Sequence, residues 1–562
     1  MPNLMDIPAQ AVGRIRTLVG AYGSRGAAEL HYLRKMIEAG VLRLDAPHHL
    51  AGLLADMRRW GEFGALASLN ARRHPDRLAV IDDDGEMTFR EFDAAAHALA
   101  NALLAKGVRG GDGVAVLARN HRWFLVAVYG AARMGARVIL LNTEFSGPQI
   151  RDVCAREGAK LLIYDDEYAA AVADLEPELG KLRALGHNPD DPDAPGGSEE
   201  TLADLVARLG PAPAPRATRH ATIIILTSGT TGTPKGAVRS APPSLAPVGG
   251  ILSHVPFKAG ERTALPAPMF HALGFLHSTI AMMLGNTLVL RRRFRSATLL
   301  ADIERYRPTA VVLVPVMLSR LLDQFEQADP KPDLSSLRIV FVSGSQLGAE
   351  LASRALKELG PVVYNLYGST EVAFAAIARP QDLSINPATV GPVVKGITVK
   401  ILDDNGNELP PGQVGRIFVR NTFPFQGYTD GGNKQIIDGM LSSGDVGYFD
   451  EHGLLYVSGR DDEMIVSGGE NVFPAEIEDL LNGHPDIVEA GAIGVEDKEW
   501  GQRLRVFVVR KPGSQLDETG VKQYVRDHLA RYKVPRDVVF LDALPRNPTG
   551  KVLKRQLKEL EV

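Results

Sequence analysis

The chain has 562 residues, which is too long for one compact domain, and 45% of them are hydrophobic, which is enough for several large cores. Its formal net charge of −4 gives no reason to expect nucleic-acid binding. Cys154 is the only cysteine, so an intramolecular disulfide is excluded, and the chain shows no signal-peptide pattern and no apolar run long enough to cross a bilayer. These features predict a cytoplasmic protein.

Residues 1–62 are predicted to form a helical N-terminal extension that is separable from the rest of the chain. Arginine and lysine are interspersed there with leucine, isoleucine and methionine. An amphipathic helix on the anionic inner face of a membrane has this pattern. A helical cap on the main body, or a contact between subunits of a homo-oligomer, has it too. The sequence leaves these alternatives open.

From Leu78 onward, short aliphatic runs alternate with helical stretches, which indicates α/β units with largely parallel sheets. Pro, Asp, Gly and Ala are frequent over 187–218, so this segment is predicted to be an exposed connection with a short helix at 201–209. The other predicted strands and helices of this part are 114–117, 124–134, 138–141, 147–157 and 160–164.

The stretch 227–236 follows an apolar run, 223–226, that is predicted to be a buried strand. Its glycines let backbone N–H groups turn toward one point, and its hydroxyls and Lys235 add donors and a positive charge. A concave set of donors binds phosphate, although a Gly/Thr-rich surface turn is the alternative. It is not a Walker loop, because Gly236 follows the lysine. The expected phosphate ligands are Thr227, Ser228, Gly229, Thr230, Thr231, Gly232 and Lys235.

A second α/β unit is predicted over 309–366, and strand-and-turn patterns at 398–402 and 414–419 indicate a smaller β-rich subdomain. The last hundred residues form another αβ block. The predicted fold is therefore α/β, with a large N-terminal domain of two α/β subdomains plus a β-rich subdomain, and a small mobile C-terminal α+β domain.

The run 364–371, Tyr-Asn-Leu-Tyr-Gly-Ser-Thr-Glu, brings together groups that suit a nucleotide. Tyr367 can stack on a base, Thr370 can donate to phosphate, and Glu371 can hold Mg²⁺. Asp445 could bind the ribose hydroxyls, and Arg460 adds a cation. Near the end of the chain, Lys551 stands on a Gly/Pro-shaped turn. A core tyrosine, a capping aspartate or a solvated lysine would explain each feature singly, but not their joint occurrence.

These motifs resemble the adenylate-forming superfamily, which comprises acyl- and aryl-CoA synthetases, peptide-synthetase adenylation domains and beetle luciferases. The resemblance covers about residues 63–562, and the chain is most similar to bacterial fatty-acyl-CoA synthetases. It implies a domain over 63–461 and a mobile domain over 462–562 that turns about Asp462. The motifs that carry it, in the family's order, are TSGTTGTPKG, YGSTE, SGDVGYFD, GRDDEMIVSGGENVFPAEIE and NPTGK.

The resemblance implies two half-reactions that use ATP, Mg²⁺ and CoA. A carboxylate first attacks the α-phosphorus of ATP and pyrophosphate leaves; a thiol then attacks the acyl-adenylate and AMP leaves. Lys551 is expected to carry the first step, with Thr370, and Glu371 is expected to bind Mg²⁺, with Thr230 as a weaker ligand. The expected adenosine-binding residues are Gly344, Ser345, Gln346, Asn365, Tyr367, Gly368, Asp445 and Arg460, and the expected CoA-binding residues are Gly468, Gly469 and Glu470.

The segment 266–275 matches the part of the family that borders the acyl pocket, so Leu273, Phe275 and Val316 are expected to line it. His271 is expected to gate access of the thiol, or else to be a hydrogen-bonded wall residue. No acidic residue stands in these segments to meet an α-amino group. A medium- or long-chain fatty acid is therefore the predicted substrate, and an aryl or cyclic acid is the alternative.

The basic run 291–295 is predicted to be a solvated strand end, with the 3′-phosphate of CoA or a membrane as alternative contacts. Two rival functions remain. The acyl group could pass to a carrier-protein thiol, although no large insertion lies between Glu371 and Gly444. A non-catalytic nucleotide-binding protein is the other rival, and the intact Lys235, Glu371 and Lys551 argue against it.

Overall fold

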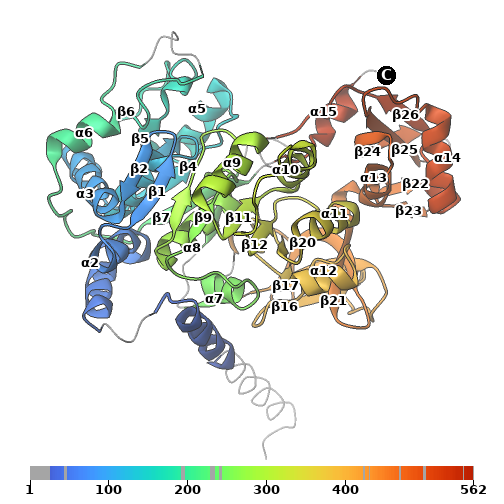
Figure 1. Ribbon diagram of the computed structural model, residues 1–562, viewed down its shortest axis with the longest axis horizontal. Coiled ribbons are helices and arrows are strands. Elements are labelled where there is room, and N and C mark those ends of the chain that lie inside the picture. The colour runs from blue at the N-terminus through green and yellow to red at the C-terminus, as the bar shows by residue number, and fades with distance from the viewer. Residues whose placement is uncertain are drawn as a thin grey trace, which may run out of the picture.

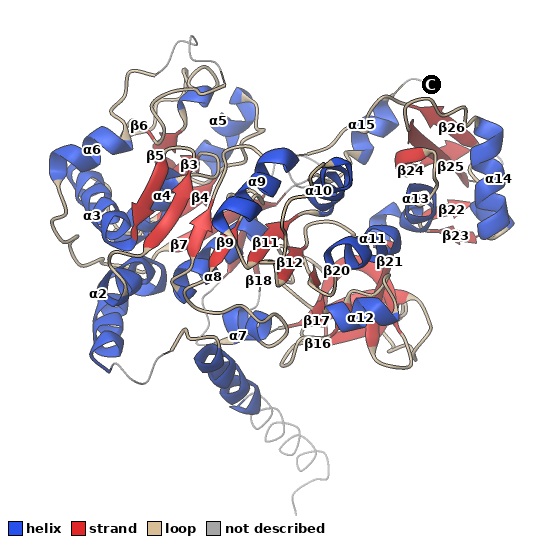
Figure 2. Ribbon diagram, in the orientation of Figure 1, coloured by secondary structure: helices blue, strands red, loops and turns tan. Residues whose placement is uncertain are grey.

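The computed structural model describes residues 26–42, 47–190, 197–227, 235–239, 244–421, 425–429, 431–467, 470–497, 501–547 and 550–560. Within these residues the strands form four sheets, and helices cover them (Figures 1 and 2). This is the predicted α/β architecture.

The first α/β sheet has seven strands in the order β18-β8-β7-β4-β3-β5-β6. The strands from β7 to β6 are parallel, whereas β8 and β18 run antiparallel at one edge. The predicted strands are all present, within one or two residues of the expected ends. The strands are β3 (Gly113–Leu117), β4 (Arg137–Leu140), β5 (Ala159–Tyr164), β6 (Lys181–Arg183), β7 (Thr222–Thr227), β8 (Lys235–Arg239) and β18 (Phe425–Tyr428).

Helices surround this sheet because the strands are apolar on both faces. Thr88 and Glu91 form a capping box at the start of α3, which fixes where that helix begins. The helices are α3 (Phe89–Ala105), α4 (Arg122–Arg133), α5 (Gly147–Arg156) and α6 (Leu202–Leu209), and a 3₁₀ turn, η1 (Asp166–Tyr168), follows β5.

The second sheet has eight strands in the order β14-β13-β12-β11-β9-β10-β1-β2. The segment from Leu78 contributes to this sheet rather than to the first one, since Val80 pairs in parallel with Leu288. The strands are β1 (Leu78–Asp82), β2 (Gly85–Thr88), β9 (Arg262–Ala264), β10 (Thr287–Val289), β11 (Ala310–Leu313), β12 (Ile339–Val342), β13 (Val363–Tyr367) and β14 (Ala376–Ala378). The helices are α7 (Ala246–Leu252), α8 (Ala272–Leu284), α9 (Ser296–Tyr306), α10 (Pro315–Gln327), α11 (Ala349–Leu359) and α12 (Pro380–Ile385).

The β-rich subdomain is an antiparallel sheet in which β19 pairs with β20 beside the path β15-β21-β20-β17-β16. Its strands are β15 (Gly391–Pro392), β16 (Thr398–Leu402), β17 (Gly415–Arg420), β19 (Ile436–Ile437), β20 (Met440–Phe449) and β21 (Leu454–Arg460).

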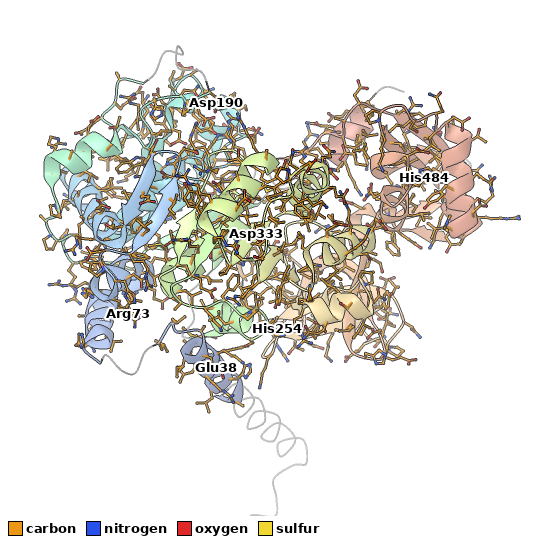
Figure 3. The ribbon with its side chains drawn as sticks, in the orientation of Figure 1. Glu38, Arg73, Asp190, His254, Asp333 and His484 are labelled. Carbon is orange, nitrogen blue, oxygen red and sulfur yellow. The ribbon has the colours of Figure 1, made fainter. Side chains whose placement is uncertain are left out.

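The C-terminal sheet, in the order β23-β22-β25-β24 with β26 beside β25, has a hydrophobic core of its own. The chain reaches it from β21 through a 3₁₀ turn, η2 (Asp461–Glu463). The strands are β22 (Ile465–Ser467), β23 (Glu470–Val472), β24 (Ile487–Asp497), β25 (Gly501–Arg510) and β26 (Asp537–Phe540). The helices are α13 (Pro474–Asn482), α14 (Glu518–His528) and α15 (Lys554–Glu559), and η3 (Arg531–Lys533) is a further 3₁₀ turn. In Figure 3, His484 marks this block and Asp190 marks the first α/β unit, on opposite sides of the view.

The N-terminal segment contains a helix over residues 26–38 and then α2 (Pro47–Arg73), which breaks at Gly61 with φ 73°. The predicted boundary at residue 62 thus falls inside α2. Trp60 is buried, and its indole N–H donates to Pro215 O at 2.9 Å. These residues pack on the main body, as a helical cap would. Membrane contact and homo-oligomer formation through this segment stay predictions.

Candidate active site

A cleft of about 2220 Å³ runs between the second sheet, the β-rich subdomain and the C-terminal block. The loops that follow β12 and β13 both open into it, because the carboxyl ends of parallel strands meet at one edge of a sheet. The predicted residues that the structure brings together in its lining are Lys235, His271, Leu273, Phe275, Val316, Gly344, Ser345, Gln346, Asn365, Tyr367, Gly368, Thr370, Glu371, Asp445, Arg460 and Lys551.

Asp445 of β20 lies at the centre of a polar group in this cleft. The Tyr367 hydroxyl donates to Asp445 Oδ2 at 2.7 Å, and Arg460 Nη1 lies 3.4 Å from Asp445 Oδ1. Burial raises the pKa of Asp445, while the charges of Arg460 and Lys551 and the hydrogen bonds limit that rise. Burial, and next to it the negative charge of Asp445, also raise the pKa of Tyr367 well above its ordinary value. The tyrosine is therefore a neutral hydrogen-bond donor.

Glu371 is held by two hydroxyl groups. Tyr428 donates to Oε1 at 2.5 Å and Ser369 donates to Oε2 at 2.8 Å. Burial acts to raise the pKa of Glu371, but these hydrogen bonds more than offset it, and the pKa lies below its usual value. The side chain is therefore an ionised carboxylate. Lys235 Nζ lies 5.4 Å from the centre of the Tyr428 ring, so Lys235, an expected phosphate ligand, and the Glu371 carboxylate share a neighbour.

These groups fit a magnesium ion that is held mainly by substrate phosphates. Mg²⁺ usually keeps several waters and takes one or two protein carboxylates. The described residues contain no group of three or more metal-ligating side chains. Glu371, ionised and facing the cleft, would supply the one carboxylate, and the ion would neutralise phosphate charge.

Lys551 enters the cleft on a turn that presses against the N-terminal part of the molecule. Gly550 has φ +77°, and a Cβ at this position would lie 2.2 Å from Val316 Cγ1 at the start of α10. The backbone N–H of Lys551 donates to Asn547 Oδ1 at 2.8 Å. A positive φ and this close approach both require glycine before the lysine. Val316, expected in the acyl pocket, thus also contacts the lysine turn.

The loop after β12 contacts the C-terminal block as well. The Gln346 side chain was expected at the adenine wall, and here its Nε2 donates to Asp479 Oδ2 of α13 at 2.9 Å. Burial, together with the charges of Glu478 and Glu476, raises the pKa of Asp479 to about 7. In this arrangement the C-terminal block therefore touches the candidate nucleotide site through Asp479 and Lys551.

His271 lies at the N-terminal end of α8, and its Nε2 has no hydrogen-bond partner among the described residues. Burial lowers its pKa to about 4, so the ring is neutral. His277, one turn and a half further along α8, is similar: its pKa is lowered to about 4, Nδ1 donates to Leu273 O at 2.9 Å, and its ring lies 4.2 Å from that of Phe341.

Several predicted residues lie outside the described part of the chain, namely Ser228, Gly229, Thr230, Thr231, Gly232, Gly468 and Gly469. For Thr227, Asp462 and Glu470 the structure describes the backbone only. Asp462 stands in η2, between the last strand of the β-rich sheet and the first strand of the C-terminal sheet. This is the position that a hinge between the two parts would occupy.

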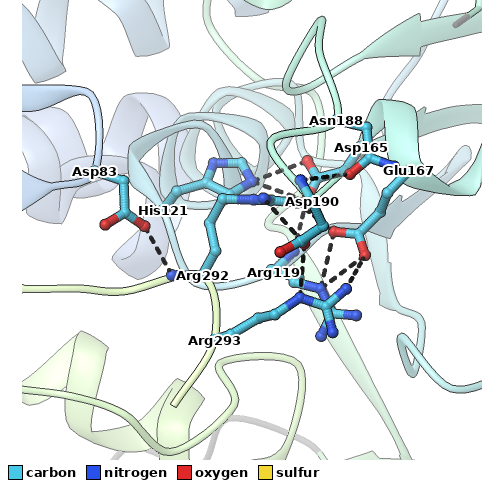
Figure 4. A network of polar contacts seen from close by, with 9 residues as sticks. All are labelled: Asp83, Arg119, His121, Asp165, Glu167, Asn188, Asp190, Arg292 and Arg293. Carbon is cyan, nitrogen blue, oxygen red and sulfur yellow. Dashed lines mark hydrogen bonds and ion pairs between the residues drawn. The ribbon is translucent and has the colours of Figure 1, made fainter. Parts of the chain in front are cut away.

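The basic run 291–295 is not among the residues that line the cleft. The expectation of a solvated strand end is wrong for Arg291 and Arg292. Arg292 is paired with Glu167, and the side chains of Arg292 and Glu167 are each 7% exposed. Arg291 pairs with Asp302 at 2.7 Å and with Asp83 at 2.8 Å. Figure 4 shows the network around Arg292 and Arg293, which meet Glu167 and Asp190. Arginines tolerate burial when they are paired with acidic side chains. The basic run itself does not reveal these partners, because they lie far away in the sequence.

Other lining residues were not predicted from the sequence. Tyr428 and Asp479 are distant in sequence from the groups they contact, and no local pattern marks them. His277 lies just beyond the segment 266–275 that was expected to border the acyl pocket. The cleft also extends along residues of the N-terminal helices, Met57 and Phe63 among them.

Comparison with known proteins agrees with this geometry. The AMP-binding enzyme family matches residues 68–429, and the AMP-binding enzyme C-terminal domain matches residues 476–551. The chain belongs to the AMP-binding enzyme family. The resemblance to adenylate-forming enzymes is confirmed, and this enzyme is an AMP-forming acid–thiol ligase that uses ATP, Mg²⁺ and CoA.

Its relatives act on different acids. It is 33% identical over 505 residues to an indoleacetate–CoA ligase of Aromatoleum aromaticum, covering 87% of this chain and 96% of that protein. It is 29% identical over 508 residues to the fatty acid–[acyl-carrier-protein] ligase ScoC of Streptomyces coeruleorubidus, covering 88% and 95%. The solved o-succinylbenzoate CoA synthetase of Bacillus subtilis, in complex with its acyl-adenylate, is 28% identical with a TM-score of 0.75 and covers 88% of this chain and 98% of that one.

None of the helices in the described ranges combines the length and the apolar character of a membrane span.

Proposed function

We propose that this enzyme activates a medium- or long-chain fatty acid to acyl-AMP and transfers the acyl group to CoA, giving acyl-CoA, AMP and pyrophosphate. The observation that carries the choice of acid is the lining beside α8. Leu273, Phe275 and Val316 are apolar, and the two histidines in this part are neutral. An apolar chain fits these surroundings, whereas a charged acid side chain would lie without a partner.

For the first half-reaction, Asp445 and Arg460 would hold the ribose, Tyr367 would lie against adenine, and the loop 227–235 would hold the β- and γ-phosphates. A carboxylate nucleophile is repelled by ATP unless cations screen the phosphates. Lys551 would supply that charge where the carboxylate meets the α-phosphate. Its position in the same cleft as Asp445 supports this role.

For the second half-reaction, the C-terminal domain over 462–562 would turn about Asp462 and bring 468–470 toward the pantetheine arm of CoA. A hinge absorbs its change of φ and ψ at a few residues, often in a loop. The passage of the chain between two sheets through η2 supports this assignment. His271 would gate the thiol.

The test is a panel of carboxylic acids, scored with purified protein for pyrophosphate release and for acyl-CoA. We expect the highest kcat/KM with unbranched acids of medium or long chain. A preference for indole or phenyl acids would overturn the choice of acid without affecting the ligase activity.

A second candidate acceptor follows from the similarity to ScoC, whose name states a carrier-protein substrate. Release of AMP that depends on CoA supports the first proposal. Release that requires an acyl-carrier protein, with no response to CoA, would support the second.

A further inference from the structure

The N-terminal helices form one wall of the cleft that holds the candidate active site. Residues from the 26–38 helix, from the turn after it and from α2 line the cleft, and of these only Glu62 carries a charge. The apolar wall consists chiefly of Met36, Leu53, Met57, Phe63, Leu66 and Leu69.

The break in α2 lets both halves of the helix line the same space. Leu53 and Met57 stand one turn apart before Gly61, and Phe63 and Leu66 stand nearly one turn apart after it. Gly61 has φ 73° and ψ −178°, which redirects the chain between the two pairs. Without this break the second half of α2 would continue in the direction of the first.

The wall is continuous with the part of the cleft beside α8, where the substrate acid is proposed to bind. The Phe63 ring lies 5.8 Å from the ring of Phe275 on α8, a predicted acyl-pocket residue. On α8 the Thr279 hydroxyl donates to Phe275 O at 2.9 Å, and the Asn70 amide of α2 donates to Met282 O of α8. Apart from Glu62, the side chains of this wall are apolar, so the wall suits an apolar occupant.

The wall is fixed to the body of the enzyme. Glu29 accepts hydrogen bonds from Ser244 Oγ at 2.7 Å and from Leu245 N at 2.9 Å. Tyr32 is fully buried, and Gly249 of α7 approaches it so closely that an added Cβ would lie 2.3 Å from Tyr32 Cβ. The backbone N–H of Ala259 donates to Ala39 O at 2.8 Å.

We propose that the chain of the substrate acid runs past Phe275 along this wall, so that the N-terminal helices set the chain length that the enzyme accepts. The proposal deepens the fatty-acid function above and rests on it. The AMP-binding enzyme family matches this chain only from residue 68, so residues 36–66 of the wall lie before the matched part. Chain-length selection would thus depend on a segment outside the family match.

Met57→Trp tests the proposal, because a larger ring would fill the far part of the space. Each methylene excluded from apolar surroundings costs about fourfold in kcat/KM. We expect kcat/KM for hexadecanoate to fall at least about tenfold, since several methylenes are displaced, and that for hexanoate to change less than about twofold. Leu54→Trp is the matched control: Leu54 is 49% exposed, does not line the cleft, and should leave both values unchanged.

A second measurement uses the unaltered protein, so it does not depend on how the variant folds. A fatty acid with a diazirine at its end, bound in the presence of ATP and irradiated, should label residues within 26–73. Equal loss for both acids in folded Met57→Trp, no loss for either, or label found only outside 26–73 would each overturn the proposal. If no acid of any length supports pyrophosphate release, the fatty-acid function itself fails, whereas the labelling still reports where the chain binds.

Discussion

Lys551 and Asp445 are 106 positions apart in the sequence, and one lies in a turn before α15 while the other lies on β20, yet both line one cleft. Burial raises the pKa of Asp445, and the lysine charge is one of the influences that limit this rise. At the scale of single residues, the site is a set of charges that act on one another before any substrate binds. Two predictions concern these charges.

Lys551→Ala should slow acyl-AMP formation on the order of 10²–10³-fold, because loss of a preorganised electrostatic contact has costs of this size. Thioesterification from supplied acyl-AMP should largely survive. Pyrophosphate release and acyl-CoA formation, measured separately, check this. Equal loss in both half-reactions would contradict the assigned role.

Glu371→Gln should raise the Mg²⁺ concentration needed for half-maximal pyrophosphate release, because a neutral amide binds the ion less tightly than a carboxylate. A titration of activity with Mg²⁺ measures it. Ser369→Ala serves as a control, since it removes one hydrogen bond to Glu371 and keeps the charge. Its Mg²⁺ dependence should shift less than that of Glu371→Gln. An unchanged titration in Glu371→Gln would show that the ion is held elsewhere.

At the scale of elements, the ion-pair network of Figure 4 joins the two α/β sheets. Glu167 follows β5 of the first sheet and accepts from Arg119 at 2.8 Å, while Arg292 and Arg293 reach it from the segment after β10. Asp165 beside it contacts His121 Nε2 at 2.8 Å. The basic run therefore holds two subdomains together.

Glu167→Gln should lower the free energy of unfolding by on the order of 3 kcal/mol, because Arg119 loses the carboxylate it is paired with and the buried Arg292 keeps only the more distant Asp190, at 3.6 Å, among the described residues. Asp76→Asn is the control. Its pair with Arg90 is 83% and 64% exposed, and such surface pairs contribute less than about 1 kcal/mol. Urea unfolding midpoints compare the two variants. Equal effects would show that burial of the Glu167 pair is unimportant.

At the scale of the whole molecule, the C-terminal block meets the body through Gln346 and Asp479. The docked arrangement favours the protonated form of Asp479, whose pKa of about 7 exceeds that of an exposed aspartate, about 3.9. Docking therefore becomes less favourable as the pH rises above about 4. Above about pH 7 the full free-energy cost of ionising Asp479 in the docked arrangement is present. We therefore expect the contact between the C-terminal block and the body to depend on pH through Asp479.

The docked fraction should accordingly fall between about pH 4 and about pH 7 in the wild type, and Asp479→Asn should remove most of this dependence. Energy transfer between dyes on Lys357→Cys and Lys511→Cys would measure it, since the native Cys154 is buried and stays unlabelled. A docked fraction that rises with pH would contradict the assignment.

Much of the fold was predictable because its signals are local. The apolar runs at β3, β4 and β5 and the helices between them follow from periodicity and composition. Strand partners do not follow from such patterns: β1 pairs with β10, and β18 with β8, since these pairings bury apolar faces that distant segments supply. For the same reason, the partners of Arg292 and Tyr428 could not be predicted from the sequence.

By itself, the sequence determined the family, the order of the motifs and the kinds of groups available for chemistry, because glycine turns, hydroxyls and charges at fixed spacing have local physical roles. Only the tertiary structure decided which of these groups meet. It joined Tyr367 to Asp445, placed the Lys551 turn against Val316, and laid the N-terminal helices along the cleft. These contacts arise from the packing of whole elements, whose burial energies sum over many residues that no single motif contains.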